Sequence, residues 1–236
     1  MGEFIKNIDN AIEDLQRGKF VLIFDNESRE CETDLVMASE FVKPNSIKTM
    51  RRDGGGLIFL MTSYETAEKL KLPFLSDLFS EIDDKYPVLK ELVPNDIPYD
   101  TKSSFSLYIN HRDTFTGITD NDRCLTMTKF AELSKKIENL NDDHAIKMLG
   151  KEFRSPGHIP ICIASPNLLK ERKGHTELVV SLLKMAGVTP IGSGCEIMGD
   201  NGKALSKEKA KQYAEKHGLV FIEGKEIIDA WVKWSK

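Results

Sequence analysis

Apolar residues recur along the chain in patterns that change repeatedly between helical and strand-like spacing. Near the N-terminus they follow helical spacing, and Gly18 comes where a left-handed C-cap would lie, which predicts an opening helix. The apolar positions of this helix are Ile5, Ile8, Ile12 and Leu15. Continuous apolar runs at residues 20–24 and 34–39 predict two strands, so the acidic stretch between them is a loop.

Capping residues and further apolar runs predict the remaining elements. Helices are predicted after Pro44, after the N-cap Ser63, after Thr126, after Ser165 with Pro166 in the first turn, and after Ser206. Strands are predicted at residues 104–111, 159–165 and 219–223. Residues 72–103 are rich in Pro and Asp without a clear period, which indicates a long functional loop or irregular excursion. The interleaved order predicts a mixed α/β (α+β) fold, a single domain over residues 1–236 with one mixed sheet and surrounding helices.

Composition narrows the class of protein. The 33 basic and 37 acidic residues give a net charge of −4, without the basic stripe typical of nucleic-acid binding. No apolar run reaches the roughly 18–20 residues that span a bilayer, and the N-terminus lacks a signal pattern. The four cysteines lie far apart and do not form a zinc or disulfide pattern. We therefore expect a soluble cytoplasmic protein with reduced thiols that binds neither membrane nor nucleic acid.

The loop between the first two predicted strands is densely acidic. Its charged residues are Asp25, Glu27, Arg29, Glu30, Glu32 and Asp34. Such a loop can be a solvated turn without function, and it lacks the glycine and spacing of a calcium-binding EF-hand. If it is locally extended, Glu30, Glu32 and Asp34 point to one face, where they would suit a hard divalent cation and the hydroxyls of a polar substrate. Arg29 could then hold a substrate anion or orient a carboxylate.

A second candidate lies where an apolar-periodic helix begins within residues 171–187. The residues at its start are Arg172, Lys173, Gly174, His175 and Thr176. Free N–H groups and the positive end of the helix dipole favour an anion there, and two basic side chains add charge. The alternative is a simple helix cap by Thr176 beside a surface histidine. The pattern of a nucleotide P-loop is absent.

Two further residues could exchange protons. The stretch "FRSPGHIP" predicts that His158 lies on a turn at the mouth of a strand, and "GSGCEIMGD" places Glu196 after a glycine-rich approach. Both could serve as general acid and base, although a lone histidine is often structural. The stretches "RRDGGGLI" and "TFTGITDNDR" are interpreted as turns.

Taken in order, "RECETD", "FTGITDNDR", "FRSPGH", "RKGHTE" and "CEIMGD" resemble the 3,4-dihydroxy-2-butanone-4-phosphate synthase family of riboflavin biosynthesis, in its stand-alone archaeal-like form. The resemblance covers roughly residues 5–225. It implies a lyase that converts D-ribulose 5-phosphate into 3,4-dihydroxy-2-butanone 4-phosphate and formate. It also implies Mg²⁺ as the cofactor, with Mn²⁺ as a second candidate, and a homodimer with sites near the subunit interface.

The resemblance also assigns residues. It implies that Glu30 and His175 bind the metal and that His158 and Glu196 transfer protons, with the division of steps between them left open. The implied substrate contacts are Arg29, Asp34, Thr116, Arg172, Lys173, Gly174, Thr176 and Glu196. This sequence departs from the family's pattern at Cys31, where Gly is commoner, and at Phe59, where Cys is common.

The implied reaction requires groups of the kinds that these residues supply. Removing a proton beside the ketone creates an enediolate that a divalent cation can stabilise, and a phosphate clamp would orient the unreactive end. Two alternatives stay open at this point: another metal-dependent sugar-phosphate isomerase or aldolase, and a non-catalytic metabolite- or cation-binding domain. Release of formate separates the first alternative from the synthase reaction.

Overall fold

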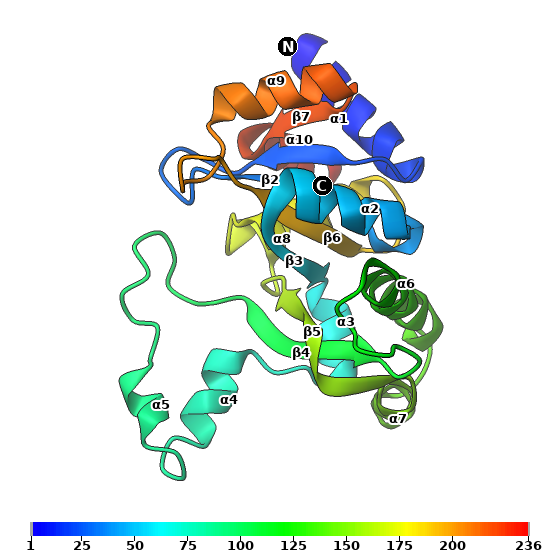
Figure 1. Cartoon of the computed structure of the whole chain (residues 1–236), viewed down its shortest axis with the longest axis vertical. Helices are drawn as coiled ribbons and strands as arrows, with labels where there is room; N and C mark the ends of the chain where they lie inside the picture. Colours follow the sequence, from blue (N-terminus) through cyan, green and yellow to red (C-terminus); the bar gives the residue numbers. More distant parts are fainter. Residues whose placement is uncertain (1, 236) are drawn as a thin grey trace.

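A seven-stranded mixed sheet with the order β4-β5-β3-β6-β2-β1-β7 runs through the protein, as the computed structural model shows (Figure 1). Residues 2–235 are described, with side chains from residue 7 onward, so the predicted helical position Ile5 lies outside the described side chains. The strands are β1 (Val21–Phe24), β2 (Thr33–Ala38), β3 (Gly55–Thr62), β4 (Phe105–His111), β5 (Phe153–Ile163), β6 (Ile191–Ile197) and β7 (Val220–Glu223). The β1/β7 and β3/β5 pairs are parallel and the other neighbours antiparallel, which confirms the predicted mixed sheet.

Helices cover both faces of this sheet (Figure 1). Those described are α1 (Gly2–Gln16), α2 (Pro44–Thr49), α3 (Tyr64–Leu70), α4 (Leu75–Glu81), α5 (Val88–Glu91), α6 (Asp120–Ile137), α7 (Asp142–Glu152), α8 (His175–Met185), α9 (Lys207–His217) and α10 (Gly224–Trp234). Apolar side chains of α1, α8 and α10 pack on one face, which we call the α8 face. Helices α2, α3, α6, α7 and α9 pack on the opposite face. None of the described helices is long and apolar enough to cross a membrane.

The alternation of side chains along the strands decides which residues share the α8 face. Val36 of β2 and Phe59 of β3 both pack in the core beneath α8. Because side chains two positions apart on a strand point the same way, Asp34 lies on the same face as Val36. Asp34 is paired directly with Glu196 of β6. The fold therefore places two carboxylates side by side where α8 begins.

Two predicted helix starts differ from the structure. Helix α6 begins at Asp120, not after Thr126, because the Thr119 side chain accepts the Asp122 N–H and caps an earlier turn. After Ser165 there is only a 3₁₀ turn over Leu168–Lys170. Leu168 has a φ of 47°, a left-handed conformation that cannot continue an α-helix.

Strands β3 and β6 and helices α7 and α10 were absent from the sequence prediction. The two strands contain several glycines, which weaken the usual strand signal. Helix α7 carries few apolar residues, and its cap Asn141 is its clearest sequence mark. Gly18 takes the left-handed conformation expected after the first helix.

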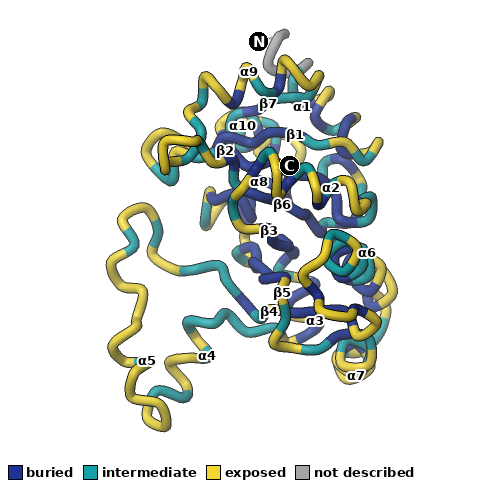
Figure 2. Tube along the Cα trace, in the orientation of Figure 1, coloured by how far each residue is buried: buried dark blue, intermediate teal, exposed yellow. Residues whose placement is uncertain are grey.

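The segment between α3 and β4 is the irregular excursion predicted for residues 72–103. It holds only the short helices α4 and α5 and is largely exposed (Figure 2). The chain extends away from the sheet and then returns towards it before β4 (Figure 1). Its returning end carries Tyr99 and Asp100, which both contact Arg29 of the acidic loop.

Candidate active site

The acidic loop between β1 and β2 is folded around the buried side chain of Asp25. Its two carboxylate oxygens accept the N–H groups of Glu30 at 3.0 Å and Glu32 at 3.1 Å. The loop is therefore a compact turn over residues 27–30 and not the extended segment considered from the sequence. Cys31 is exposed within it and has a φ of 57°, a left-handed conformation that favours glycine.

Glu30 and His175 meet although 145 residues separate them in sequence. The Nδ1 atom of His175 lies 3.0 Å from Oε2 of Glu30, and Nε2 of His175 lies 3.6 Å from Oδ1 of Asp34. Both of these last two atoms are buried without a hydrogen-bond partner among the described residues. Ligand atoms of Asp25, Glu30 and His175 lie within 4.8 Å of one another. We call Asp25, Glu30, Glu32, Asp34, His175 and Glu196 the acidic cluster.

The carboxylates of this cluster influence one another's ionisation. Burial and the neighbouring carboxylates of Glu196 and Glu30 raise the pKa of Asp34 to about 8, although His175 opposes the shift. Burial and the carboxylates of Glu30 and Glu196 also raise the pKa of Glu32. The cluster therefore holds more carboxylates than positively charged groups that could balance them.

His175 and Glu30 show the complementary shifts. Burial would lower the pKa of His175, but the negative charges of Asp34 and Glu30 raise it to about 9. Burial would raise the pKa of Glu30, but contacts with His175 and Arg29 lower it to about 2. An imidazole, several carboxylates and two unpartnered buried atoms fit a hard divalent cation, which would supply the missing positive charge.

Two arginines beside the acidic cluster converge on one carboxylate. Arg29 donates to Asp100 Oδ2 at 2.8 Å, and Arg172 donates to the same oxygen at 2.6 Å. Arg172 also donates to the buried Glu177 at 2.6 Å, which fixes its guanidinium at the start of α8. The Asp100 carboxylate thus lies between the two guanidinium groups, at a position where a substrate anion could bind both of them.

The other predicted phosphate contacts lie next to Arg172. Gly174 and Thr176 are buried at the start of α8, whereas the side chain of Lys173 is exposed. The Gly174 N–H donates to Glu177 at 3.2 Å, so the Glu177 carboxylate already accepts one of the N–H groups at the start of the helix. The anion position is therefore defined mainly by the two arginines.

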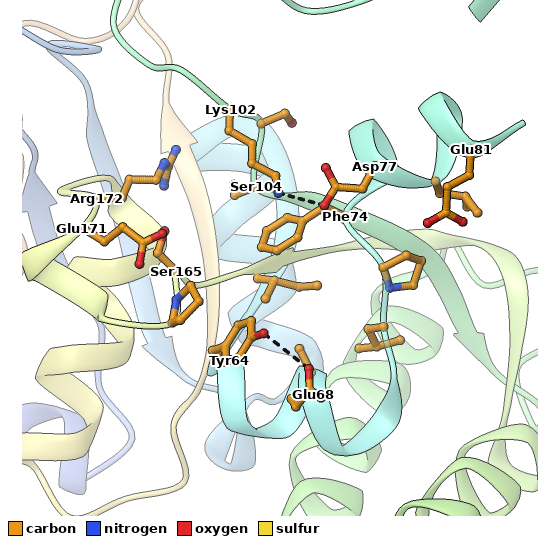
Figure 3. Close-up of a pocket in the computed structure, with 17 residues that line it drawn as sticks. Tyr64, Glu68, Phe74, Asp77, Glu81, Lys102, Ser104, Ser165, Glu171 and Arg172 are labelled. Carbon is orange, nitrogen blue, oxygen red and sulfur yellow. Dashed lines mark hydrogen bonds and ion pairs between the residues drawn. The ribbon is translucent and has the colours of Figure 1, made fainter. Parts of the chain in front are cut away.

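A cavity of about 430 Å³ opens between the excursion and the body of the protein, on the other side of Arg172 (Figure 3). Arg172, Glu171 and Ser165 line one side, and Phe74 and Asp77 of the excursion line the other. Lys102 donates to Asp77 at 2.8 Å across its upper rim. The cavity does not include the acidic cluster, but it leaves space beside the returning end of the excursion.

Glu196 completes the acidic cluster from β6. Its Oε2 accepts the Leu57 N–H at 2.7 Å, and burial raises its pKa. A Cβ atom at Gly56 would lie 2.8 Å from both the Cβ atom and the backbone carbonyl oxygen of Glu196, so only glycine permits this approach of β3. The glycine run interpreted as a turn therefore leads into β3 and makes room for Glu196.

His158 and Thr116 lie in a different group of residues. On β5, Ile159 pairs with Ile109 and Arg154 pairs with Asn110, so residues 155–158 form a bulge inside the strand. His158 is thus part of a strand and not of a turn before it. Both His158 and Thr116 contact Asn110. We call Asn110, Thr116 and His158 the bulge cluster, and no hydrogen bond or ion pair within the described residues links it to the acidic cluster.

Sequence reasoning assigned no role to three residues in or beside these clusters. Asp25 directly follows a buried strand, a position at which a polar residue often serves a site, and this signal could have been used. Asp100 lies in a segment without periodic pattern, and Asn110 lies in a predicted strand. Only tertiary contacts single out these last two.

Comparison with known proteins identifies the family. The sequence model described as 3,4-dihydroxy-2-butanone 4-phosphate synthase matches residues 9–230. The chain belongs to this family. Among curated members, the 3,4-dihydroxy-2-butanone 4-phosphate synthase of Methanothermobacter thermautotrophicus is 44% identical over 98% of this chain and 99% of the relative. The synthase of Methanosarcina mazei is 46% identical over 98% of this chain and 93% of the relative.

Solved 3,4-dihydroxy-2-butanone 4-phosphate synthases share the fold. The enzyme of Candida albicans superposes with a TM-score of 0.71 at 29% identity, covering 94% of this chain and 96% of that one. A synthase solved in complex with two magnesium ions gives a TM-score of 0.72 at 24% identity, covering 96% of each chain. The latter similarity concerns the fold alone.

Family membership decides between the functions left open by the residues. The synthase family acts in riboflavin biosynthesis as lyases that form 3,4-dihydroxy-2-butanone 4-phosphate and formate from ribulose 5-phosphate. The resemblance drawn from the five motifs is confirmed, and so are the predicted enzyme class and reaction. The isomerase, aldolase and non-catalytic alternatives are not needed.

Proposed function

We propose that the synthase reaction takes place at the acidic cluster, with a divalent cation held by Glu30 and His175. The observation that carries this proposal is the contact between these two side chains, 3.0 Å apart across 145 residues of sequence. Asp25 supports the metal site indirectly, because its oxygens already accept two N–H groups of the loop. It positions Glu30 rather than serving as a principal ligand.

Magnesium is the proposed cation, and manganese is the alternative. Oxygen-rich sites suit both ions, and a solved family member was obtained with two magnesium ions. When bound, the cation would act as a Lewis acid that stabilises negative charge on the substrate oxygens. Arg29 and Asp34 would hold the sugar hydroxyls beside it.

The phosphate of ribulose 5-phosphate would bind at Arg172 and the start of α8, with Lys173, Gly174 and Thr176. The convergence of Arg29 and Arg172 on Asp100 supports this position, because the carboxylate marks where an anion is favourable. Substrate would then displace Asp100 and the returning end of the excursion. Thr116 would contact the phosphate from the bulge cluster.

Glu196 and His158 would carry the proton-transfer chemistry. Glu196 is paired with Asp34 across neighbouring strands, so it lies beside the proposed metal site. Burial raises its pKa, which suits a group that must both take up and release a proton.

The active enzyme would be a cytoplasmic homodimer. Large apolar side chains are exposed around the bulge cluster, the start of β3 and the end of β6, which favours burial against a second copy. They are Leu57, Tyr108, Phe115, Ile118 and Met198. Four free cysteines suit a reducing compartment.

The test of the proposed function is a product assay. Purified protein incubated with ribulose 5-phosphate and Mg²⁺ should release formate and the four-carbon phosphate in equal amounts. A chelator should abolish both products, and added Mg²⁺ should restore them. Turnover of the substrate without formate would contradict the proposal.

A further inference from the structure

Asn110 holds both the backbone and the ring of His158. Its buried side chain extends from the end of β4 towards the bulge of β5. Its Oδ1 accepts the backbone N–H of His158 at 2.8 Å, and its Nδ2 lies 3.1 Å from Nδ1 of the imidazole. The same Nδ2 lies 3.4 Å from the carbonyl oxygen of Thr116.

These partners fix the orientation of the Asn110 amide. A backbone N–H can only donate, so the amide atom facing it must be the oxygen. A backbone carbonyl can only accept, so the atom facing Thr116 must be the nitrogen. The atom facing the ring of His158 is therefore an N–H donor. It follows that Nδ1 of His158 accepts this bond and carries no proton.

The amide is closely packed, and its hydrogen bonds keep it from turning over. Gly117 has a φ of 99°, and a Cβ atom there would lie 2.1 Å from Nδ2 of Asn110. The loop after β4 therefore closes directly on the amide, with a glycine at the point of contact. Rotation of the amide would break the bond to the His158 backbone and place two acceptors together at Thr116.

A second asparagine–histidine pair in the protein has the opposite arrangement. In α7, Oδ1 of Asn141 accepts the backbone N–H of His144 at 3.0 Å and lies 2.9 Å from its ring Nδ1. Here the ring faces an acceptor, so Nδ1 of His144 carries a proton. The two pairs provide an internal contrast between an amide nitrogen and an amide oxygen at the same ring atom.

We propose that Asn110 is a positioning residue that holds His158 as the neutral tautomer protonated at Nε2, so that His158 meets the substrate as a hydrogen-bond donor. The inference rests on the proposed role of His158 in the reaction. Protonation of Nδ1 would set two N–H groups against each other, which the geometry of the pair disfavours. A neutral imidazole can stabilise a developing oxyanion by donating from Nε2. Removal of the substrate proton then falls to Glu196.

The tautomer can be read directly by NMR of the whole protein labelled with ¹⁵N-histidine. The ring nitrogens of His158, identified by their loss in His158→Asn, should show a protonated Nε2 and an unprotonated Nδ1 in the wild-type protein. His144 should show the reverse. A wild-type His158 protonated at Nδ1 would overturn the proposal without any variant having to fold.

The substitution Asn110→Asp keeps the acceptor for the backbone but replaces the donor facing the ring with an acceptor. The proton should move to Nδ1, and kcat should fall by about 10²-fold or more while KM changes by less than about threefold. The matched control Asn141→Asp leaves an oxygen facing His144, so neither tautomer nor kcat should change. Full kcat with a reversed His158 tautomer would contradict the inference. A wild-type protein that is inactive on ribulose 5-phosphate would instead overturn the proposed reaction, because the spectrum alone decides the tautomer.

Discussion

The acidic cluster and the bulge cluster are held in place by different means. The acidic cluster is largely buried and charged, and its loop is ordered by the carboxylate of Asp25. The bulge cluster contains no carboxylate and is partly exposed, and it is ordered by an amide and by the close approach of Gly117. In the first region a buried carboxylate orders the backbone of the loop. In the second region an amide held by backbone groups orients a histidine ring.

The two arrangements suit different tasks, namely cation binding and hydrogen-bond donation. A divalent cation requires uncompensated negative charge, which a fold can maintain only by burying carboxylates close together. A hydrogen-bond donor of fixed tautomer requires only one correctly oriented neighbour. We therefore expect substitutions in the acidic cluster to affect metal binding and substitutions in the bulge cluster to affect turnover.

The largest effects are expected from Glu30→Gln and His175→Ala. Each removes a proposed ligand, so metal-dependent formate release should fall by about 10²–10³-fold or more. Circular dichroism should show that the fold survives. Glu27→Gln is the matched control, because Glu27 lies in the same loop but pairs with Lys207 at its surface. Normal magnesium dependence in either ligand variant would remove that residue from the site.

Losses confined to turnover are expected from His158→Asn and Glu196→Gln. Both variants should still bind magnesium and substrate, but kcat should fall by about 10²–10⁴-fold, the range for a lost hydrogen-bond donor to an oxyanion or a lost proton-transfer group. Substrate binding measured by calorimetry separates this result from a loss of affinity. Weakened binding with full turnover at saturation would contradict the assigned role and would blur the distinction between the clusters.

Asp100→Asn should strengthen anion binding. Burial would raise the pKa of Asp100, but Arg172 and Arg29 lower it, so its charge is retained at neutral pH. Removing that charge should lower the Kd for inorganic phosphate by about 2- to 10-fold, or roughly 0.4–1.4 kcal/mol. Asp77→Asn is the control, since Asp77 pairs with Lys102 on the same excursion. Weaker phosphate binding in Asp100→Asn would mean that Asp100 only orders the arginines.

The sequence predicted more of the acidic cluster than of the bulge cluster. Glu30, Asp34 and His175 belong to short motifs whose charge and helix-start pattern are visible locally. The fold class followed equally well from interleaved apolar runs. The partnership of Asn110 with His158 depends on a bulge that brings residues 48 positions apart together, and no local pattern encodes it. The return of Asp100 to the two arginines is a tertiary contact of the same kind.

Cys31→Gly should have the smallest effect. The left-handed conformation of Cys31 costs about 1–2 kcal/mol, and glycine relieves it but loses more entropy on folding. Magnesium-dependent activity should therefore stay within about tenfold, equivalent to about 1.4 kcal/mol. Cys31→Ala, which keeps the strain, is the matched comparison. Stoichiometric zinc in the purified protein that is lost in Cys31→Ala would show that this loop binds a soft metal.

The metal site itself offers the most direct measurement. Mn²⁺ bound in place of Mg²⁺ can be examined by pulsed EPR in protein labelled with ¹⁵N-histidine. A nitrogen coupling from one imidazole should be present in the wild-type protein and absent from His175→Gln, while His158→Asn should retain it. Tightly bound Mn²⁺ without an imidazole coupling, or with a coupling that survives in His175→Gln, would contradict the assignment of the metal site to Glu30 and His175.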